Sequence, residues 1–308
     1  MEDDEADAEK AVNAYNTLKD NGMKVFIGTV TTGACLSVVS QTKADNMFQI
    51  TPSASAAKLI ANDNCFQVCF TDPNQGTASA DYIASKGLAT KVAVIYNSSD
   101  AYSSGIYDNF KAEAAAKGLD LVASEAFTGD SKQDFSSQLS KIKASGAELI
   151  FLPIYYQEAS LILSQAKNAG ITAKFFGCDG LDGLLNIENF DKSLAENVML
   201  LTPFAANATD ETTKKFVAAY NAKYDPSTLN QFAADAYDAV YVVKAAAEKA
   251  GVTGDMSVSD ICNALKGAMT EITVDGVTGS GMTWKATGEV NKEPKAVKIE
   301  NGEYQPMD

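Results

Sequence analysis

Two apolar runs in the middle of the chain each end in a polar or aromatic residue. The run AELIFLPI is followed by Tyr155, and the run AKFFG is followed, after one cysteine, by Asp179 in a glycine-flanked loop. The amphipathic stretch between the runs predicts two parallel strands joined by a helix, and an open parallel sheet binds ligands just beyond the carboxyl ends of its strands. Tyr155 and Asp179 are therefore candidates for one site. The alternative is structural, with Tyr155 in the core and Asp179 as a helix N-cap, a position that aspartate favours.

Hydroxyl residues follow earlier apolar runs in the same way. Thr32 comes after KVFIGTV, Ser53 and Ser55 flank Ala54 after MFQI, and Tyr102 follows KVAVIY. Hydroxyls at a helix start cap the helix, and the unpaired N–H groups there also accept a carboxylate. Most serine-rich helix starts are only caps, so Ser53 and Ser55 suit either role. Taken together, the hydroxyls and helix N-termini suit a carboxylate, the acid suits an ammonium group, and the tyrosines suit an apolar portion.

The elements that position these residues alternate along most of the chain. Helices are expected over 5–20, after Gly33, after Pro52, and over 74–87, 103–117 and 134–144; strands are expected over 24–30, up to Ile50, and over 65–70, 91–96 and 119–125. This alternation predicts an α/β fold of parallel sheets with helices on both faces. After Leu201 come helical patterns at 210–223, 230–249 and 257–268, then short strands at 283–285 and 296–300.

The charge balance and the missing histidines restrict the function classes. The 308 residues carry 25 Lys+Arg against 40 Asp+Glu, a net charge of -15, which repels nucleic acid and anionic membrane surfaces. Histidine is absent, so Ser-His-Asp chemistry and the commonest metal ligand are missing. Neither a GxGxxG nor a GxxxxGK[ST] phosphate loop nor a GxSxG nucleophile motif occurs. No cofactor is expected, and an enzyme of doubly wound fold is the weakest interpretation.

The five cysteines give no motif. Cys35, Cys65, Cys69, Cys178 and Cys262 show no CxxC spacing, and an odd number cannot all pair within the chain. Cys65 and Cys69 share one face of a strand-like run, where they are too far apart for a disulfide. We interpret the cysteines as small buried hydrophobic residues.

Several segments, in order along the chain, carry a family resemblance. They are EDDEADAEKAVNAYN, IGTVTTGACLSV, ITPSASAAKL, CFTDPNQGTASADYI, KVAVIYNSSDAYSSG, IFLPIYYQEASLILSQAKNAGI and FFGCDGLDG. Together they resemble the branched-chain amino-acid (Leu/Ile/Val) binding proteins of bacterial ABC transporters, which are type I periplasmic binding proteins with two α/β lobes. The resemblance covers essentially the whole chain.

The resemblance implies a clamshell that closes on a free amino acid and presents it to an ABC transporter permease outside the cytoplasm, in the periplasm or as a cell-surface lipoprotein. An N-lobe of residues 1–72 and 203–290 and a C-lobe of 73–202 and 291–308, joined by three hinge crossings, are expected. Domains of this fold also serve as ligand-sensing modules of receptors or regulators, which is the alternative function. The sequence does not fix which amino acid is bound.

The resemblance also assigns roles to residues of each lobe. In the N-lobe, the family's carboxylate and amino-group contacts match Thr32, Ser53 and Ser55, together with the backbone of Ala54. In the C-lobe, the family's two tyrosines match Tyr102 and Tyr155, and its acid matches Asp179, where relatives often have glutamate. Tyr156 and Phe204 are candidate further wall residues.

The start of the chain departs from the family pattern. Family members begin with a strand, a helix and a second strand before the EDDEADAEKA segment, so an N-terminally truncated N-lobe is expected. The chain opens on no basic or apolar stretch, so no signal peptide is expected in these residues. The apolar run Val25-Phe26-Ile27 would then form an unpaired sheet edge, which predicts self-association or weak ligand binding.

Overall fold

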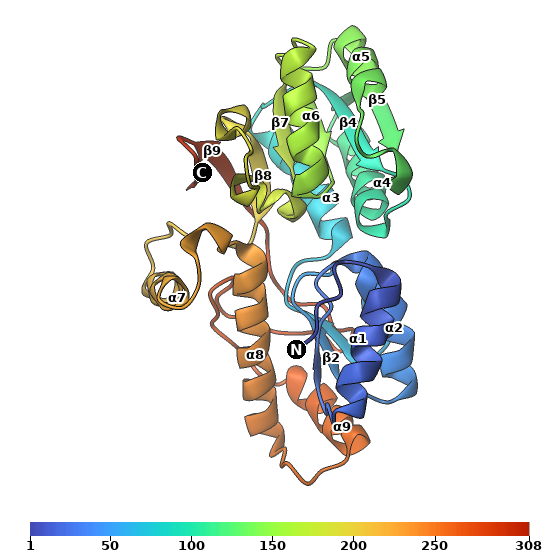
Figure 1. Cartoon of the computed structure of the whole chain (residues 1–308), viewed down its shortest axis with the longest axis vertical. Coiled ribbons are helices and arrows are strands. Elements are labelled where there is room, and N and C mark those ends of the chain that lie inside the picture. Colours follow the sequence, from blue (N-terminus) through green and yellow to red (C-terminus); the bar gives the residue numbers. More distant parts are fainter. Residues whose placement is uncertain (308) are drawn as a thin grey trace. The chain divides into compact units, whose positions relative to one another are not determined.

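The computed structural model describes residues 1–307 and divides into two compact units. Unit 1 comprises Met1–Thr71 and Phe232–Glu293, and unit 2 comprises Asp72–Gln231 and the described residues from Pro294 onward. The chain therefore passes from one unit to the other three times, which Figure 1 allows the reader to follow by colour.

Unit 1 contains a small parallel sheet covered by helices. Its strands are β1 (Phe26–Ile27), β2 (Gln49–Thr51) and β3 (Cys65–Gln67), in the order β1-β2-β3. Its helices are α1 (Ala8–Asp20), α2 (Thr32–Ala44), α8 (Gln231–Ala250, which begins one residue before unit 1 resumes) and α9 (Val258–Met269), with a short 3-10 helix, η1 (Leu59–Ala61).

The two faces of the unit 1 sheet follow from the alternation of side chains along its strands. Phe48, Ile50 and Phe66 pack in one hydrophobic cluster with residues of α8 and α9. Gln49 and Cys65 point to the other face of the sheet. There Gln49 contacts α2, and Cys65 belongs to a hydrophobic cluster that includes residues of α2. Period-two alternation thus places Phe48, Ile50 and Phe66 against α8 and α9, and Gln49 and Cys65 toward α2.

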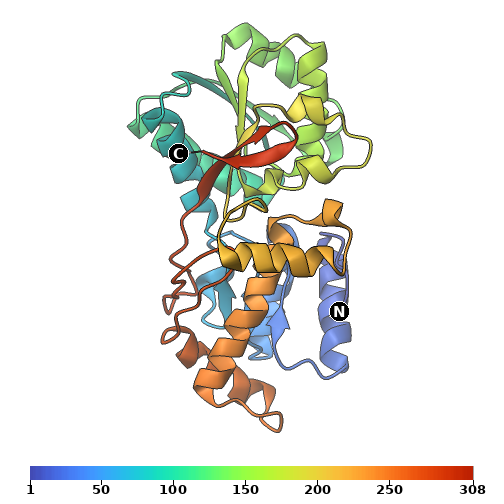
Figure 2. The ribbon, with the colours of Figure 1, turned by 90° about the vertical axis from the view of Figure 1, so that its left-hand side faces the viewer.

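Unit 2 contains a larger, mostly parallel sheet. Its strands are β4 (Lys91–Asn97), β5 (Asp120–Phe127), β6 (Leu149–Leu152), β7 (Lys174–Gly177), β8 (Met199–Thr202), β9 (Lys295–Glu300) and β10 (Glu303–Pro306), in the order β10-β9-β8-β7-β6-β4-β5. The pairs from β5 to β8 are parallel, whereas β9 is antiparallel to both β8 and β10. Figure 2 shows the β9–β10 hairpin in red at one end of this sheet.

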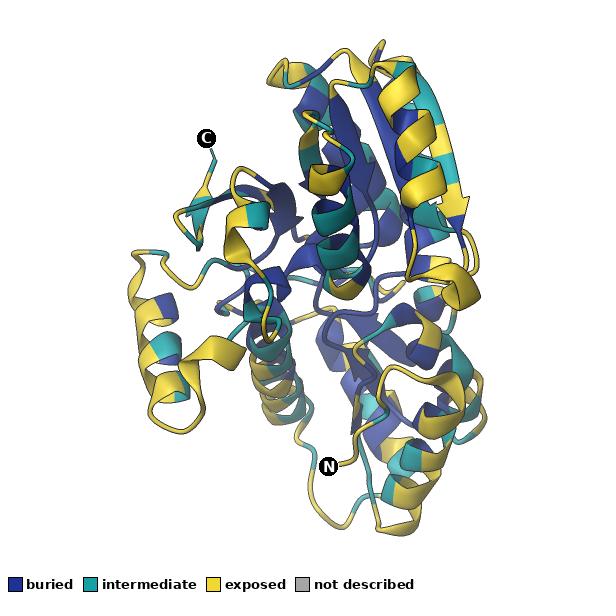
Figure 3. Cartoon of the chain, turned by 45° about the horizontal axis from the view of Figure 1, so that its top comes forward, coloured by how far each residue is buried: buried dark blue, intermediate teal, exposed yellow. Residues whose placement is uncertain are grey.

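Helices cover both faces of the unit 2 sheet. They are α3 (Asp72–Ser85), α4 (Ala101–Ala116), α5 (Ser136–Ser145) and α6 (Tyr156–Asn168). Unit 2 also contains α7 (Glu211–Asn221) and the 3-10 helices η2 (Gly129–Ser131), η3 (Asp179–Leu181), η4 (Leu184–Asn186), η5 (Lys192–Ala195) and η6 (Pro226–Thr228). Ile95 and Ile150 pack with residues of α5 and α6, whereas Val94 and Phe151 pack with residues of α3 and α4. Figure 3 shows the inner strands buried, whereas most residues of the outer strand β5 are intermediate or exposed.

The expected α/β architecture is confirmed, and three local expectations are wrong. The strand expected over 24–30 is only Phe26–Ile27; the Gly28 N–H still donates to the Ile50 carbonyl at 2.9 Å, and after it the φ of +150° at Gly28 takes the chain out of the sheet. No helix begins after Pro52: the Thr51 hydroxyl accepts the Ala54 N–H at 2.9 Å, which holds a loop instead. Residues 283–285 contribute only an isolated bridge between Trp284 and Val290.

The division into units differs from the expected lobes over residues 203–231, which lie in unit 2 rather than unit 1. Phe204 packs edge-on against Phe216 of α7, with ring centroids 5.9 Å apart. Gln231 accepts a hydrogen bond from Thr202, at the end of β8, at 2.9 Å. The contact of Gln231 ties the segment to the sheet of unit 2, whereas the Phe204–Phe216 contact lies within the segment.

The outer strand β1 gives unit 1 a partly apolar edge. Among residues 1–307, β1 pairs with β2 alone, and Ile27 is 36% exposed and Val30 40% exposed. Self-association through this edge stays a prediction. We expect Ile27→Lys to lower the apparent mass in a light-scattering dilution series, and an unchanged dilution profile would count against association at β1.

The close approach of α3 to α4 in unit 2 allows a stability prediction. A Cβ atom at Gly76 would lie 2.5 Å from the Ile106 carbonyl oxygen and 2.8 Å from the Phe110 nitrogen, both backbone atoms of α4. We expect Gly76→Ala to lower the free energy of unfolding by about 1 to 3 kcal/mol through overpacking. Gly267→Ala in α9, where a Cβ would meet nothing within 4 Å, is the matched control and should stabilise slightly. Equal melting curves for the two variants would refute this account.

Candidate functional site

Three candidate residues of unit 2 follow adjacent strands of its sheet. Tyr102 lies in the first turn of α4 after β4, Tyr155 precedes α6 after β6, and Asp179 opens η3 after β7. Strands β7, β6 and β4 are neighbours, and the carboxyl ends of parallel strands meet at one edge of a sheet. The topology therefore brings the three residues together, and we call them the unit 2 triad.

Direct contacts join the members of the unit 2 triad. The Tyr102 hydroxyl donates to Asp179 Oδ1 at 2.6 Å and accepts from the Gly180 N–H at 2.9 Å. The rings of Tyr102 and Tyr155 are stacked, with centroids 4.7 Å apart and an interplanar angle of 18°. The triad thus presents one carboxylate beside two aromatic rings.

The carboxyl group of Asp179 is buried, with the residue 2% exposed. Burial raises its pKa to about 6, the hydrogen bond from Tyr102 opposes the rise, and the nearby charge of Asp182 adds to it. None of the groups that shift this pKa is a cation. A buried carboxylate without a cationic partner is an electrostatic complement for a positively charged ligand.

Two glutamines and a second aspartate hold the Asp179 segment, and sequence reasoning missed all three. Gln75 accepts the Asp179 N–H at 3.3 Å, and the Gln231 side chain donates to the Asp179 carbonyl at 2.7 Å. Asp182 in turn accepts the Gln231 N–H at 2.7 Å. Glutamines at helix starts carry no motif, whereas a second acid in the same GLDG loop was a signal that could have suggested Asp182.

The candidates of unit 1 also lie together. Thr32 is the first residue of α2, and Ser53, Ala54 and Ser55 form the loop after β2. The Thr32 hydroxyl accepts the Ser55 N–H at 3.2 Å, which ties the loop to the helix start. We call these four residues the unit 1 loop site.

The N-terminus of helix α2 lies at this loop, and no side chain caps it. Its N-cap residue is Thr31, which makes no capping hydrogen bond, whereas Asp7 caps α1 through two backbone N–H groups. The first backbone N–H groups of a helix carry positive partial charge and suit an anion. The unit 1 loop site therefore combines hydroxyls with a helix N-terminus, which is the chemistry that binds a carboxylate.

Residues of unit 1 also fix the backbone of the loop. The Gln67 amide donates to the Ala54 carbonyl at 3.0 Å, and the Cys69 thiol donates to the Ser53 carbonyl at 2.8 Å. The buried Trp284 indole donates to the Gln67 carbonyl at 2.8 Å. The loop is thus positioned by β3 and by the segment that carries Trp284.

Tyr156 and Phe204, the candidate further wall residues, take no part in the contacts that join the unit 2 triad. Tyr156 lines a hollow of about 280 Å³ in unit 2, where its ring lies 3.0 Å from the position of a Cβ on Gly183. Phe204 packs against Phe216 of α7. Their participation in ligand binding stays a prediction.

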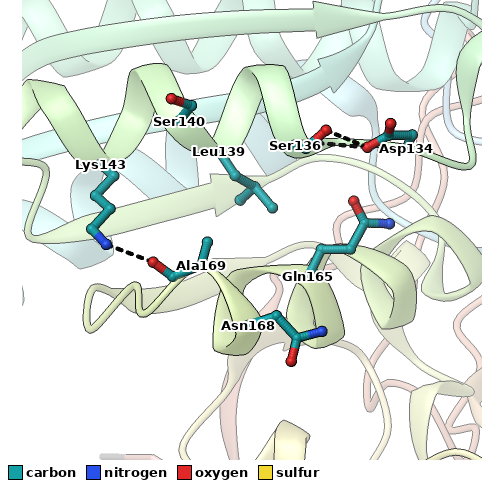
Figure 4. Close-up of a pocket in the computed structure, with 8 residues that line it drawn as sticks. All are labelled: Asp134, Ser136, Leu139, Ser140, Lys143, Gln165, Asn168 and Ala169. Atoms are coloured by element: carbon teal, nitrogen blue, oxygen red, sulfur yellow. Dashed lines mark hydrogen bonds between the residues drawn. The ribbon is translucent and has the colours of Figure 1, made fainter.

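A larger hollow in unit 2 lies between α5 and α6 and has a volume of about 550 Å³. Figure 4 shows two contacts among its polar groups: Lys143 Nζ donates to the Ala169 carbonyl at 2.6 Å, and Asp134 accepts from Ser136. Gln165 bonds the backbone on both sides of Asp134. We therefore assign this hollow a structural role.

Residues 1–307 contain neither a candidate metal-binding cluster nor a helix that could span a membrane. Residues 1–307 contain no group of His, Cys, Asp and Glu side chains arranged to hold a metal ion. In the same part of the chain, every helix is too short or too polar to span a bilayer.

Comparison with known proteins gives a family match over nearly the whole chain. A family model described as periplasmic binding protein matches residues 1–303. The Leu/Ile/Val-binding protein homolog 3 of Brucella melitensis is 33% identical over 256 residues, covering 82% of this chain and 68% of that protein.

Solved structures of two binding proteins superpose closely on this chain. The leucine-binding protein LivK of Thermotoga maritima superposes with a TM-score of 0.87 at 25% identity, covering 99% of this chain and 85% of that one. The branched-chain amino-acid transporter substrate-binding protein LivJ of Streptococcus pneumoniae, in complex with isoleucine, superposes with a TM-score of 0.85 at 27% identity and covers 99% and 84%.

Proposed function

Because this chain belongs to the periplasmic binding protein family, we propose that it captures a free branched-chain aliphatic amino acid and delivers it to the permease of an ABC transporter. The observation that carries the proposal is the buried Asp179 carboxyl, which is bonded to Tyr102 and has no cation among the groups that shift its pKa. Relatives named for leucine, isoleucine and valine support the ligand class.

The two sites divide the charged groups of the amino acid between them. The unit 1 loop site, with the Thr32 hydroxyl and the N-terminus of α2, takes the α-carboxylate. Asp179 takes the α-ammonium, and the stacked rings of Tyr102 and Tyr155 contact the apolar part. Ligand contacts of both units favour the liganded conformation over the free one, and the permease recognises that conformation.

The proposal places the protein outside the cytoplasmic membrane as the binding component of a transporter. Members of this family are solute-binding components rather than enzymes, and no turnover of the amino acid is part of the proposed function. A sensing role in a receptor or regulator is the alternative, and the names of the relatives do not favour it.

The experiment that tests the proposal is a thermal-shift screen of the purified protein against the twenty amino acids, followed by calorimetry on those that raise the melting temperature. We expect leucine, isoleucine and valine to give the largest shifts, since ligand that binds only the folded state raises its stability. If none of the twenty amino acids shifts the melting temperature, the proposed function is wrong. If only charged or aromatic amino acids do so, the ligand class is wrong.

Thr32 provides a test of the carboxylate assignment. We expect Thr32→Val to weaken amino-acid binding by roughly 5- to 15-fold, equivalent to about 1 to 1.5 kcal/mol for a lost hydrogen bond. Thr32→Ser keeps the hydroxyl and is the matched control, with affinity near that of the wild type. Calorimetry that gives the same affinity for the valine and serine variants would remove Thr32 from the site.

A further inference from the structure

Gln231 lies at the point where the chain leaves unit 2. It is the last residue of unit 2 before Phe232 and the first residue of helix α8, and it is fully buried. A residue at a helix start contributes to the helix through its backbone. The side chain of Gln231 makes two further hydrogen bonds, both to other elements of unit 2. The residue is therefore a connector as well as the start of a helix.

Three hydrogen bonds join Gln231 to the ends of two strands. Its side-chain Nε2 donates to the Asp179 carbonyl at 2.7 Å, and its Oε1 accepts from the Thr202 hydroxyl at 2.9 Å. Its backbone N–H donates to Asp182 Oδ2 at 2.7 Å. The two aspartates follow β7 and the threonine ends β8, so these bonds hold the first turn of α8 at two neighbouring strand ends.

Burial makes these bonds costly to break. Asp179, Asp182 and Thr202 are all buried, so water does not readily replace a lost partner. A shift of the Asp179 backbone therefore either leaves buried polar groups unpaired or carries the first turn of α8 with it. We expect the loop of the ligand-binding acid and the start of the helix to move together.

Asp182 adds an electrostatic link between the same two elements. It directly follows η3, the 3-10 helix that Asp179 opens, and its carboxylate accepts the first N–H of α8. The N-terminus of a helix carries positive partial charge, which a carboxylate stabilises. A displacement of the Asp179 loop would therefore also withdraw the negative charge that faces the helix end.

The first turn of α8 is bound a second time, on its unit 1 side. Residues four apart lie on the same face of a helix, and Asp235 follows Gln231 by four positions. Within unit 1, the buried carboxylate of Asp235 pairs with the buried ammonium of Lys292 at 3.5 Å. Lys292 directly precedes Glu293, the last residue of unit 1. The turn thus has bonds next to two of the places where the chain passes between the units.

We propose that Gln231 is a positioning residue that couples amino-acid binding at Asp179 to the order of the first turn of α8. The inference rests on the proposed function, because it takes Asp179 as the partner of the ligand ammonium. The ligand holds the Asp179 carboxylate, Gln231 holds the Asp179 carbonyl, and the turn becomes ordered with them. Coupling is reciprocal, so an ordered turn also strengthens ligand binding.

The coupling makes a claim that a purely structural bond does not. A bond that only stabilises the fold protects the turn equally with and without ligand. A coupling bond requires the ligand to reduce local opening of the turn, and amide hydrogen exchange measures such opening. The ligand-dependent change in exchange is therefore the quantity to measure.

Hydrogen–deuterium exchange followed by mass spectrometry tests the coupling. The full chain is exchanged at pH 7 with and without saturating leucine, after calorimetry on the wild type. We expect leucine to slow exchange in the peptide that covers the first turn of α8 by roughly fivefold or more, the lower limit of a typical coupling between sites. Peptides from α5 are the internal reference and should exchange at the same rate in both samples.

Gln231→Met keeps the length of the side chain and removes both of its hydrogen bonds. In this variant, saturated with leucine, the slowing at α8 should be lost, and leucine affinity should fall by roughly fivefold or more through reciprocity. Gln165→Met is the matched control, because the Gln165 amide also bonds two backbone groups of unit 2, at Gln133 and Phe135. It should melt at a lower temperature but keep the wild-type affinity and the slowing at α8.

Circular dichroism checks that each variant folds. If Gln231→Met does not fold, Gln231→Glu takes its place, since it keeps the acceptor for Thr202 and removes the donor to the Asp179 carbonyl. Slowing that persists in the leucine-saturated variant would overturn the proposal. So would unchanged exchange at α8 in a wild type to which leucine binds, and in that case the proposed function would stand. If leucine does not bind the wild type, the inference and the proposed ligand class are both wrong.

Discussion

Asp179→Ala is expected to weaken amino-acid binding by roughly 30- to 4,000-fold, since truncating one partner of a buried charge pair costs about 2 to 5 kcal/mol. The wild-type carboxylate offers its charge to the ligand ammonium from a site that is already desolvated and already bonded to Tyr102. Alanine removes the charge and leaves the Tyr102 hydroxyl without its acceptor. Isothermal calorimetry with the best ligand of the thermal-shift screen measures the effect.

Two further variants separate loss of charge from loss of structure. Asp179→Asn keeps the shape of the side chain and should retain most of the binding defect. Asp182→Asn changes an aspartate of the same burial, whose pKa is likewise raised to about 6 by burial but which bonds the Gln231 backbone. Its affinity should stay close to that of the wild type. Unchanged affinity in Asp179→Ala would mean that the ammonium binds elsewhere.

Amino-acid affinity should fall about tenfold for each pH unit below 6, which is the second large effect. The pKa of Asp179 is raised to about 6 in the ligand-free protein, so acid converts the carboxylate to its neutral form. The ligand ammonium requires the charged form, and protonation therefore competes with binding. At pH 7 the carboxylate dominates and affinity should be nearly independent of pH. Calorimetry between pH 4.5 and 8 measures the profile.

The stability of the ligand-free protein should depend on pH in the opposite sense through the same groups. Asp179 and Asp182 have folded-state pKa values near 6, above the ordinary 3.8, so the folded state binds their protons more tightly than the unfolded state. Their contribution to stability is fully present below pH 3.8 and is lost as the pH rises through 6.

In Asp179→Asn, the remaining affinity should lose its dependence on pH near 6. If the wild type binds equally well at pH 5 and pH 7, the charge assignment fails.

The unit 2 triad could be predicted because each member follows a buried strand. Apolar runs and helix-period stretches mark parallel strands, and the carboxyl ends of adjacent strands must meet, so Tyr102, Tyr155 and Asp179 come together whatever the details of packing. The unit 1 residues came from the same rule and from the family resemblance. The binding roles of all seven residues stay predictions that the variants above test.

The parts that escaped prediction depend on contacts distant in sequence. The loop after Pro52 lacks the expected helix because hydroxyls of Thr51 and Thr32 bond its N–H groups, and no local pattern reveals the second of these. The assignment of residues 203–231 to unit 2 depends on Gln231, whose partner Thr202 lies 29 positions away and carries no motif. The burial of all five cysteines was correctly predicted.

Trp284 is a built-in fluorescence probe of the unit 1 loop site. It is the only tryptophan of the chain, it is buried, and its indole N–H bonds the carbonyl of Gln67, whose side chain holds the Ala54 carbonyl. Its emission is therefore sensitive to any shift of the loop that is proposed to receive the carboxylate. Ligand titrations can be followed by intrinsic fluorescence, without a dye, and at protein concentrations too low for calorimetry.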